Sequence, residues 1–216
     1  MDFAYNDEQK EIIKVVRDLV EKEIVPYASE MDETGKLHEG LLEKLAAQGL
    51  LGVAIPEEFG GAGLDAITIA AIYEELGKGC AGVATTVAAN ALASYPVIIA
   101  GNDDQKKRYF DIINEDNLAA FALTEPGTGS DAGSVSTRAM KTEDGKGYIL
   151  NGTKCFITNG ALAEVFVVFA NTRKSGGIRG LTAFIVRKGT PGFTVGKAEN
   201  KMGIRASNTT ELIFQD

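Results

Sequence analysis

Histidine and cysteine are scarce in this 216-residue chain, which has one histidine, His38, and two cysteines, Cys80 and Cys155. A zinc site built on histidines, or a Ser-His-Asp triad, would have to use His38 itself. Two cysteines cannot form a disulfide framework, so we expect free thiols and a reducing compartment. We predict that Cys155 is a small hydrophobic residue of the core and that His38 lies in a solvated connector.

Basic runs and long apolar runs are also absent. Lys and Arg number 22 against 30 Asp and Glu, a formal net charge of -8, which argues against nucleic acid or an anionic membrane as a partner. The N-terminus shows no signal-peptide pattern. The most apolar stretch, residues 87–100, is interrupted by Asn90, Ser94 and Pro96 and is shorter than the roughly 20 residues that span a bilayer. We therefore expect a cytoplasmic protein.

What the chain does have is enough apolar sequence for a core, with 44% hydrophobic residues, and a change of character near residue 117. Residues 1–116 contain 4 Thr and 11 Gly, whereas residues 117–216 contain 12 Thr and 14 Gly. Threonine favours pleated surfaces over helices. We therefore predict an α+β protein, with an all-helical domain at residues 1–116 and a β domain at residues 117–216.

The spacing of apolar residues in the first half predicts five helices. The first begins at the capping pair Asn6 and Gln9 and ends or kinks at Pro26. The others are expected at about residues 40–48, 65–76, 83–100 and 103–113. Gly49 and Gly77 are predicted to close the second and third of the five.

Short β-rich runs fill the second half, at residues 121–123, 148–150, 165–169, 181–186 and 212–214. No amphipathic run of helical length lies between them, which favours an antiparallel β-barrel or sandwich over βαβ units. The chain stops at Asp216, directly after the last of these runs. We therefore expect the whole protein to continue beyond this residue.

The loop after the first β-rich run has the strongest ligand-binding pattern of the chain. Gly127, Gly129 and Ala132 have the spacing of a dinucleotide fingerprint, but β-branched residues rather than a helix follow them. The glycines would instead let backbone amides approach a phosphate, while the hydroxyls of Thr124, Thr128 and Ser130 converge on the same ligand. An ordinary Gly- and Ser-rich turn stays an open alternative.

This loop, Thr124-Glu125-Pro126-Gly127-Thr128-Gly129-Ser130-Asp131, resembles the signature of the acyl-CoA dehydrogenase family. Residues 151–160, and residues 201–205 with Ser207 and Thr209, resemble two further flavin-contacting segments of that family. Residues 56–63 resemble a turn of its helical domain. The matches follow the family order over the whole chain, and the wording of residues 201–205 is similar to the short-chain, butyryl-CoA dehydrogenase branch.

The resemblance implies a helical N-terminal domain, a β domain and a C-terminal four-helix bundle that this chain lacks. It implies FAD as cofactor, oxidation of a short-chain acyl-CoA thioester or the reverse enoyl-CoA reduction, electron exchange with an electron transfer flavoprotein, and a homotetramer. The alternatives are an oxidase or monooxygenase relative that reuses the FAD loop, and a non-catalytic fragment or split subunit.

The resemblance also assigns residues to the site. FAD contacts would come from two segments, Phe121, Ala122, Leu123, Thr124, Glu125, Pro126, Gly127, Thr128, Gly129 and Ser130 in the first, and Phe156, Ile157 and Thr158 in the second. Thr124 would hydrogen-bond the pyrimidine edge of the flavin, and Thr158 would place its hydroxyl near N5. Ser130 would also contact the acyl-CoA substrate. Phe156 stands where members often have Trp, and keeps an aromatic wall without the indole N–H donor.

Two absences complete these expectations. The catalytic base of the family is a glutamate of the C-terminal domain, so we expect no catalytic residue in this chain, and Glu125 belongs to the cofactor loop. No metal is expected. Two features are left with two interpretations each. Arg205 would be either a phosphate contact or a cation of a turn. The Ala-rich residues 85–94 would either line the acyl pocket or allow close helix packing.

Overall fold

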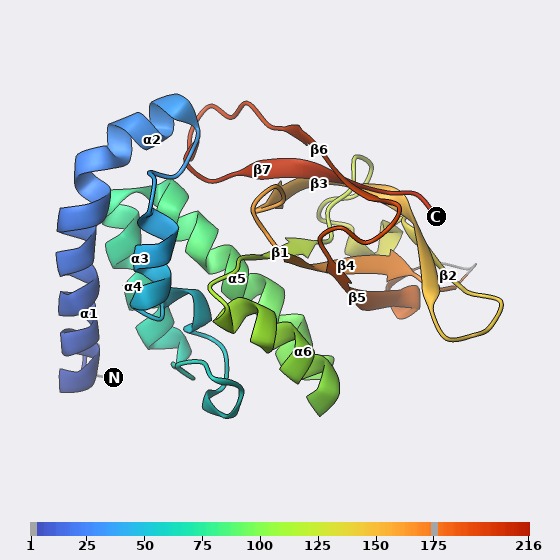
Figure 1. Ribbon diagram of the computed structural model, residues 1–216, viewed down its shortest axis with the longest axis horizontal. Coiled ribbons are helices and arrows are strands. Elements are labelled where there is room, and N and C mark those ends of the chain that lie inside the picture. The colour runs from blue at the N-terminus through green and yellow to red at the C-terminus, as the bar shows by residue number, and fades with distance from the viewer. Residues whose placement is uncertain (1–3, 174–176) are drawn as a thin grey trace.

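The computed structural model describes residues 4–173 and 177–216, and places helices in the first half of the chain and strands in the second (Figure 1). The predicted α+β class is confirmed. The α-helices are α1 (Asp7–Leu19), α2 (Ala28–Thr34), α3 (Leu41–Ala47), α4 (Ala66–Gly79), α5 (Ala81–Ala100) and α6 (Asp103–Asn114). The strands are β1 (Ala119–Ala122), β2 (Arg138–Lys141), β3 (Tyr148–Thr158), β4 (Val165–Asn171), β5 (Leu181–Arg187), β6 (Phe193–Ala198) and β7 (Thr209–Phe214).

The first helix bends where the sequence predicts. Asn6 and Gln9 form a capping box in which each side chain accepts the other's backbone N–H, at 2.8 and 3.1 Å. After α1 the backbone widens into a π-turn at Val20–Ile24 and tightens into a 3-10 turn at Val25–Tyr27, which contains Pro26. Because proline has no N–H to donate, the regular helix cannot continue, and α2 leaves in a new direction.

The end of α4 differs from the prediction, since the helix continues through Gly77 to Gly79. A Cβ atom on Gly79 would lie 2.6 Å from Cγ1 of Val20. This glycine therefore allows α4 to approach the first helix closely, and Gly77 does not act as a C-cap.

The strands form one curled sheet in the order β1-β4-β2-β3-β7-β6, with β5 also paired to β4. The sheet is mixed, because β1 and β4 run parallel whereas most other neighbours are antiparallel. Parallel strands are typically buried on both faces, and β4 shows this: Val165 and Val167 face one apolar cluster and Phe166 and Val168 face the other.

All five predicted β-rich runs contribute to strands, and the sequence missed two more, β2 and β6. Both missed strands are short of buried side chains, with Ala139 the one buried residue of β2 and none buried in β6. Their hydrophobic signal is correspondingly weak. β3 is eleven residues long and extends through Thr158, so it includes most of the second predicted flavin segment.

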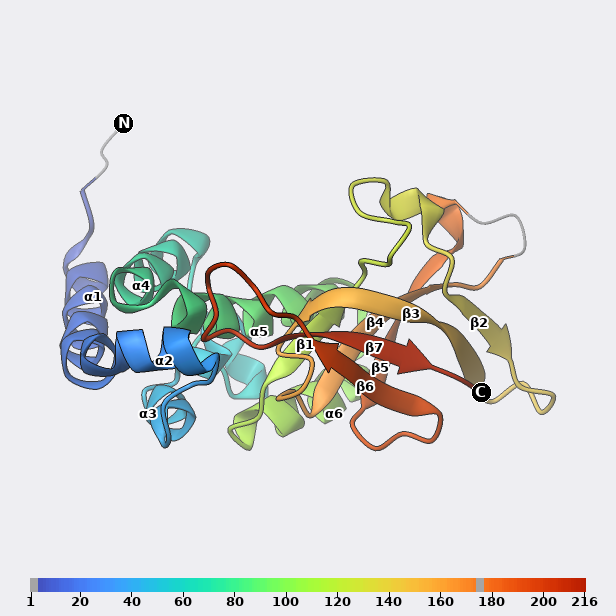
Figure 2. The same cartoon turned by 90° about the horizontal axis from the view of Figure 1, so that it is seen from above.

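α5 joins the helices to the sheet (Figure 2). Asn90 is fully buried on it and accepts the backbone N–H of Ala119 in β1 at 2.7 Å. By length and composition α5 could cross a membrane, but half of its apolar stretch is buried inside the fold, as in a core helix. Asn90, Ser94 and Pro96 do not interrupt it, and the hydroxyl of Ser94 donates to the carbonyl of Asn90 at 2.8 Å.

Candidate functional site

Two of the three predicted flavin segments lie side by side. One is the loop after β1, which rises from the sheet in yellow-green in Figure 2, and the other is the end of β3. The backbone N–H of Cys155 donates to the carbonyl of Thr124 at 2.9 Å. The ammonium of Lys154 donates to the carbonyl of Leu123 at 3.0 Å. Segments some 30 residues apart in the chain are thereby held as neighbours.

Phe156 lies at an irregularity of β3. The pairing of β3 with β7 shifts register between Lys154 and Ile157, and Phe156 has a left-handed backbone with φ of 57°. Its side chain is 63% exposed. A left-handed conformation is uncommon for a bulky residue, and such strain is often found at functional sites. The bulge leaves an aromatic ring on the surface instead of in the core.

Two hydroxyls of the predicted flavin segments have no hydrogen-bond partner in the described part of the chain. Thr124 and Thr158 are both half-buried, and neither side chain makes a hydrogen bond within residues 4–173 and 177–216. Ser130 is exposed, and its hydroxyl also has no partner in this part of the chain. A Cβ atom on Gly127 or Gly129 would meet no atom within 4 Å. The loop therefore presents open backbone and unused hydroxyls.

Thr128 does not belong with these free groups. Its side chain is buried, and its hydroxyl donates to the carbonyl of Ser134 at 3.0 Å. The expected convergence of three hydroxyls on one ligand is therefore reduced to those of Thr124 and Ser130. The bond closes the loop on itself, together with two backbone hydrogen bonds between Glu125 and Thr128, both of 3.0 Å.

Glu125 is the most tightly held residue of the loop. Its carboxylate is buried and accepts hydrogen bonds from Lys154, from the backbone and hydroxyl of Ser136, and from the backbone and hydroxyl of Thr137. Burial alone would raise the pKa of Glu125, but the bonds from Lys154, Ser136 and Thr137 outweigh it and hold the pKa at about 2. A carboxylate this acidic and fully bonded is a poor proton acceptor at neutral pH.

The remaining predicted residues divide by burial. The side chains of Ala122 and Ile157 belong to the core, so a ligand could reach only their backbone. Phe121 and Leu123 are half-buried, and Phe121 packs on Phe169 with ring centroids 5.1 Å apart. Pro126 is exposed at the loop tip.

Three residues weighed in the sequence take ordinary roles. Arg205 makes the contacts expected of a cation of a turn: its guanidinium donates to the carbonyls of Asp32 and Lys201 at 2.7 and 2.8 Å. Cys155 is buried, and burial raises the pKa of its thiol. His38 is half-buried and stacks on Tyr27 with ring centroids 3.5 Å apart, so the expectation of a solvated histidine was wrong.

The Ala-rich residues 85–94 mostly serve packing. Buried side chains alternate with an outer face around this stretch of α5, and the buried set comprises Thr86, Val87, Ala89, Asn90, Ala91, Ala93 and Ser94. Thr85 and Ala88 are half-buried and Leu92 is exposed. Only that outer face is available to a ligand.

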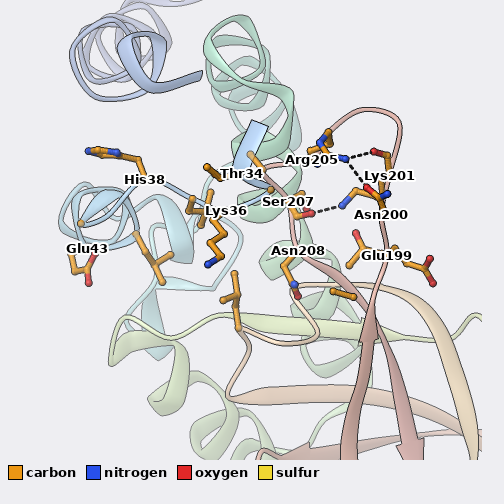
Figure 3. Close-up of a pocket in the computed structure, with 18 residues that line it drawn as sticks. Thr34, Lys36, His38, Glu43, Glu199, Asn200, Lys201, Arg205, Ser207 and Asn208 are labelled. Atoms are coloured by element: carbon orange, nitrogen blue, oxygen red, sulfur yellow. Dashed lines mark hydrogen bonds between the residues drawn. The ribbon is translucent and has the colours of Figure 1, made fainter. Parts of the chain in front are cut away.

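A cavity of about 680 Å³ lies away from this loop, between the α2–α3 and β6–β7 connections (Figure 3). None of residues 121–130 and 156–158 lines it. The third predicted flavin segment does line it, through Lys201, Arg205, Ser207 and Thr209, and Thr209 pairs with Thr158 across β3 and β7. The first two predicted flavin segments thus lie on the surface of this chain outside that cavity.

Sequence reasoning gave no role to Lys154, Ser136 or Thr137, which all bond Glu125. Ser136 and Thr137 lie in a stretch without a motif, so nothing marked them. Lys154 did leave a signal. It is a lysine in a strand between β-branched and apolar residues, and a charged side chain in such a place needs a buried partner.

Comparison with known proteins identifies both halves of the chain. Residues 6–114 match the family model of the acyl-CoA dehydrogenase N-terminal domain, and residues 120–216 match that of the acyl-CoA dehydrogenase middle domain. The chain is 44% identical over 211 residues to an acyl-CoA dehydrogenase of Bacillus subtilis, covering 97% of this chain and 55% of the relative. It is 42% identical over 217 residues to an acryloyl-CoA reductase (NADH) of Anaerotignum propionicum, covering 100% and 55%.

Solved structures agree. Butyryl-CoA dehydrogenase from Megasphaera elsdenii superposes with a TM-score of 0.92 at 43% identity, covering 100% of this chain and 57% of that one. A chain from the structure described as the electron transferring flavoprotein of Acidaminococcus fermentans gives 0.94 at 41%, covering 100% and 57%. An acyl-CoA dehydrogenase complexed with FAD from Bacillus anthracis gives 0.87 at 39%, covering 98% and 36%.

The chain thus spans little more than half the length of the curated relatives it matches. The two family models together account for almost all of its residues, in the order helical part and then sheet. On this basis the chain belongs to the acyl-CoA dehydrogenase family.

Proposed function

We propose that the whole protein containing this chain is an FAD-dependent acyl-CoA dehydrogenase that oxidises a short-chain acyl-CoA thioester or runs the reverse enoyl-CoA reduction. The observation that carries the proposal is the hydrogen bond from Cys155 to the carbonyl of Thr124. It holds the loop that carries the unpaired hydroxyl of Thr124 against the end of β3, which carries the exposed Phe156 and the unpaired hydroxyl of Thr158. We further propose residues 1–116 and 117–216 as the helical and β units of that protein.

The residues present fit a flavin. Thr124 and Thr158 have unused hydroxyls, Phe156 offers an aromatic surface, and the open backbone at Gly127 and Gly129 allows close approach. These groups would hold the ring and the polar parts of FAD, and preorganised donors of this kind stabilise developing charge without reorganising. When bound, FAD supplies the hydride acceptor.

The proton chemistry needs a base that we place outside residues 1–216. Removal of the proton next to the thioester carbonyl requires a carboxylate whose pKa is near the working pH. Glu125 does not qualify because its pKa is held at about 2. Its position next to Thr124 instead makes it part of the loop that holds the cofactor.

Substrate and partner follow from the relatives. Butyryl-CoA dehydrogenase among them supports a short acyl chain, and the A. fermentans structure supports an electron transfer flavoprotein as redox partner. Ser130, exposed at the loop, is proposed to contact the thioester substrate. A homo-oligomer and a cytoplasmic location remain proposals.

The test is the visible spectrum of the purified whole protein, followed by addition of butyryl-CoA without oxygen. We expect a bound flavin whose absorption bleaches with substrate. Thr158→Val should slow bleaching by about tenfold or more, as when one hydrogen-bond donor to a reacting group is lost. Thr194→Val, which alters an exposed hydroxyl on β6, is the control and should bleach normally.

Other outcomes identify the alternatives. Rapid reoxidation of the reduced flavin by dissolved oxygen would favour the oxidase or monooxygenase relative. A pure, folded protein that takes up no FAD would contradict the proposal and favour a non-catalytic role.

A further inference from the structure

Lys154 on β3 is hydrogen-bonded to both residues that flank Thr124 in the proposed flavin site. It lies on β3, two residues before Phe156, and its side chain is completely buried. Its ammonium donates to the carbonyl of Leu123 at 3.0 Å and to the carboxylate of Glu125 at 2.8 Å. These acceptors are the residues on either side of Thr124, so a single cation fixes both flanks of that threonine relative to β3.

Glu125 extends the connection to a third segment. One carboxylate oxygen accepts from the backbone N–H and hydroxyl of Ser136, at 2.7 and 2.5 Å. The other accepts from the backbone N–H of Thr137 at 2.9 Å, from the Thr137 hydroxyl, and from Lys154. Five donors use the lone-pair sites of an ionised carboxylate fully. The carboxylate has no capacity left for a ligand, so its effect on a ligand must be indirect.

Apart from Thr128, the residues that follow Glu125 in the loop are exposed, namely Pro126, Gly127, Gly129 and Ser130. Thr124 keeps one backbone hydrogen bond to β3, from Cys155, and has no side-chain partner among the described residues. The direction in which Thr124 presents its hydroxyl therefore depends on the buried charges next to it. Directional bonds of this kind can fix one geometry where apolar packing would allow several.

We propose that Glu125 and Lys154 form a positioning pair that sets the placement of Thr124 relative to Phe156 and Thr158, and through it the affinity and environment of the bound flavin. The pair touches neither cofactor nor substrate. This inference rests on the proposed function, because it assigns the segments joined by the pair to the flavin.

Stability and positioning can be separated with a double variant. Lys154→Met alone leaves a buried carboxylate without its cation and is expected to destabilise the fold strongly. In Glu125→Gln/Lys154→Met both charges are removed, and stability should recover in part because replacing a buried pair by neutral groups is often tolerated. If the pair has only a structural role, flavin binding should recover in the double variant along with stability. If the pair positions Thr124, flavin binding should stay weak although stability recovers.

The experiment uses the whole protein, stripped of flavin and titrated with FAD, and records affinity and the visible circular dichroism of the bound flavin. For Glu125→Gln/Lys154→Met we expect about tenfold weaker FAD binding, equivalent to the loss of one good hydrogen bond, together with an altered flavin dichroism. The control is Glu75→Gln/Arg17→Met, which removes the ion pair between the buried Glu75 and the half-exposed Arg17 in the helical half and should keep wild-type affinity and spectrum.

A milder variant covers the case in which the double variant does not fold. Thr137→Val keeps the backbone donor and the side-chain shape but removes one hydroxyl from Glu125, and should weaken FAD binding by about threefold. Wild-type affinity and dichroism in whichever of these variants fold would overturn the proposal. Absence of flavin binding by the wild-type protein is a different result, because it would contradict the proposed function and, with it, the assignment on which the pair rests.

Discussion

Two buried carboxylates, one in each half of the molecule, reach the same acidity by different means. Glu75 on α4 and Glu125 after β1 are both almost fully buried, and the pKa of each is held at about 2. Glu75 is bonded by Arg17 and Lys78, whose side chains are 51% and 54% exposed. Glu125 is bonded by Lys154, which is 0% exposed, and by backbone and hydroxyl donors.

The difference concerns what each carboxylate stabilises. The partners of Glu75 reach it from the rim of the α1–α4 contact, where solvent screens them. The partners of Glu125 come from two segments: Lys154 on β3, which is fully buried, and the neighbouring Ser136 and Thr137, of which Thr137 is buried and Ser136 is exposed. The first arrangement fastens two helices that already share an apolar core, and the second gives shape to a loop that has little core of its own.

The largest test of this comparison is removal of each cation. Lys154→Met should lower the free energy of unfolding by about 3–5 kcal/mol, because it leaves a buried carboxylate without its charge partner. Arg17→Met should cost clearly less, because Lys78 still bonds Glu75 at 2.7 Å. Urea unfolding of the whole protein measures both. Equal losses would show that internal and rim cations do not differ here.

Acid should act on both carboxylates in the same direction. Each has a pKa of about 2 in the folded protein against 4.5 for an ordinary glutamate, so the unfolded chain takes up protons first. The stability that they contribute is complete above about pH 4.5 and is lost as the pH falls toward 2. Between pH 6 and 2 the melting temperature should fall less for Glu125→Gln than for wild type.

High salt should reduce the stability contributed by Glu75 more than that contributed by Glu125. An equal effect of salt on the two contributions would contradict the comparison.

Glycines give a second contrast between the halves. A Cβ atom on Gly61 would lie 2.2 Å from the carbonyl oxygen of Ile55, whereas one on Gly129 would meet nothing within 4 Å. Gly61→Ala should therefore destabilise the fold by about 1–3 kcal/mol. Gly129→Ala should change stability by less than about 0.5 kcal/mol while weakening FAD binding. Unfolding and FAD titration are run on both, and a Gly129→Ala protein with unchanged FAD affinity would count against close approach of the cofactor there.

The smallest effect on stability is expected for a carboxylate that is exposed to solvent. Asp104 pairs with Arg108 one turn along α6, and both side chains are more than 70% exposed. Exposed pairs of this kind contribute little to stability. Asp104→Asn should leave the urea midpoint unchanged, and a clear shift would mean that exposure is a poor guide to the importance of these acidic groups.

Much of the fold could be predicted because its determinants are local. Apolar spacing, the Asn6 capping pair and Pro26 lie within a few residues of the elements that they define. The parallel pairing of β1 and β4 depends on burial of β4 from both sides, which no single run of sequence shows. The strands β2 and β6 were missed for a different reason, because they have almost no buried side chains and so only a weak hydrophobic pattern.

For the site, family resemblance supplied the residues but not their arrangement. The contacts of Thr124 with Cys155 and of Glu125 with Thr137 and Lys154 join parts of the chain that are distant or unmarked in sequence. The bond from the Thr128 hydroxyl to the carbonyl of Ser134 could not be predicted, because a hydroxyl in a glycine-rich loop looks the same in sequence whether it faces a ligand or a backbone carbonyl.

The burial of β4 on both faces has a consequence for cooperativity. Its side chains belong at once to the cluster shared with α1, α3 and α4 and to the cluster shared with α6. Unfolding of the helical half would expose apolar surface of the β half, and the reverse also holds. We therefore expect the two halves to unfold together. A single melting transition, seen alike by far-ultraviolet circular dichroism and by calorimetry, is the behaviour such an interlocked interior dictates.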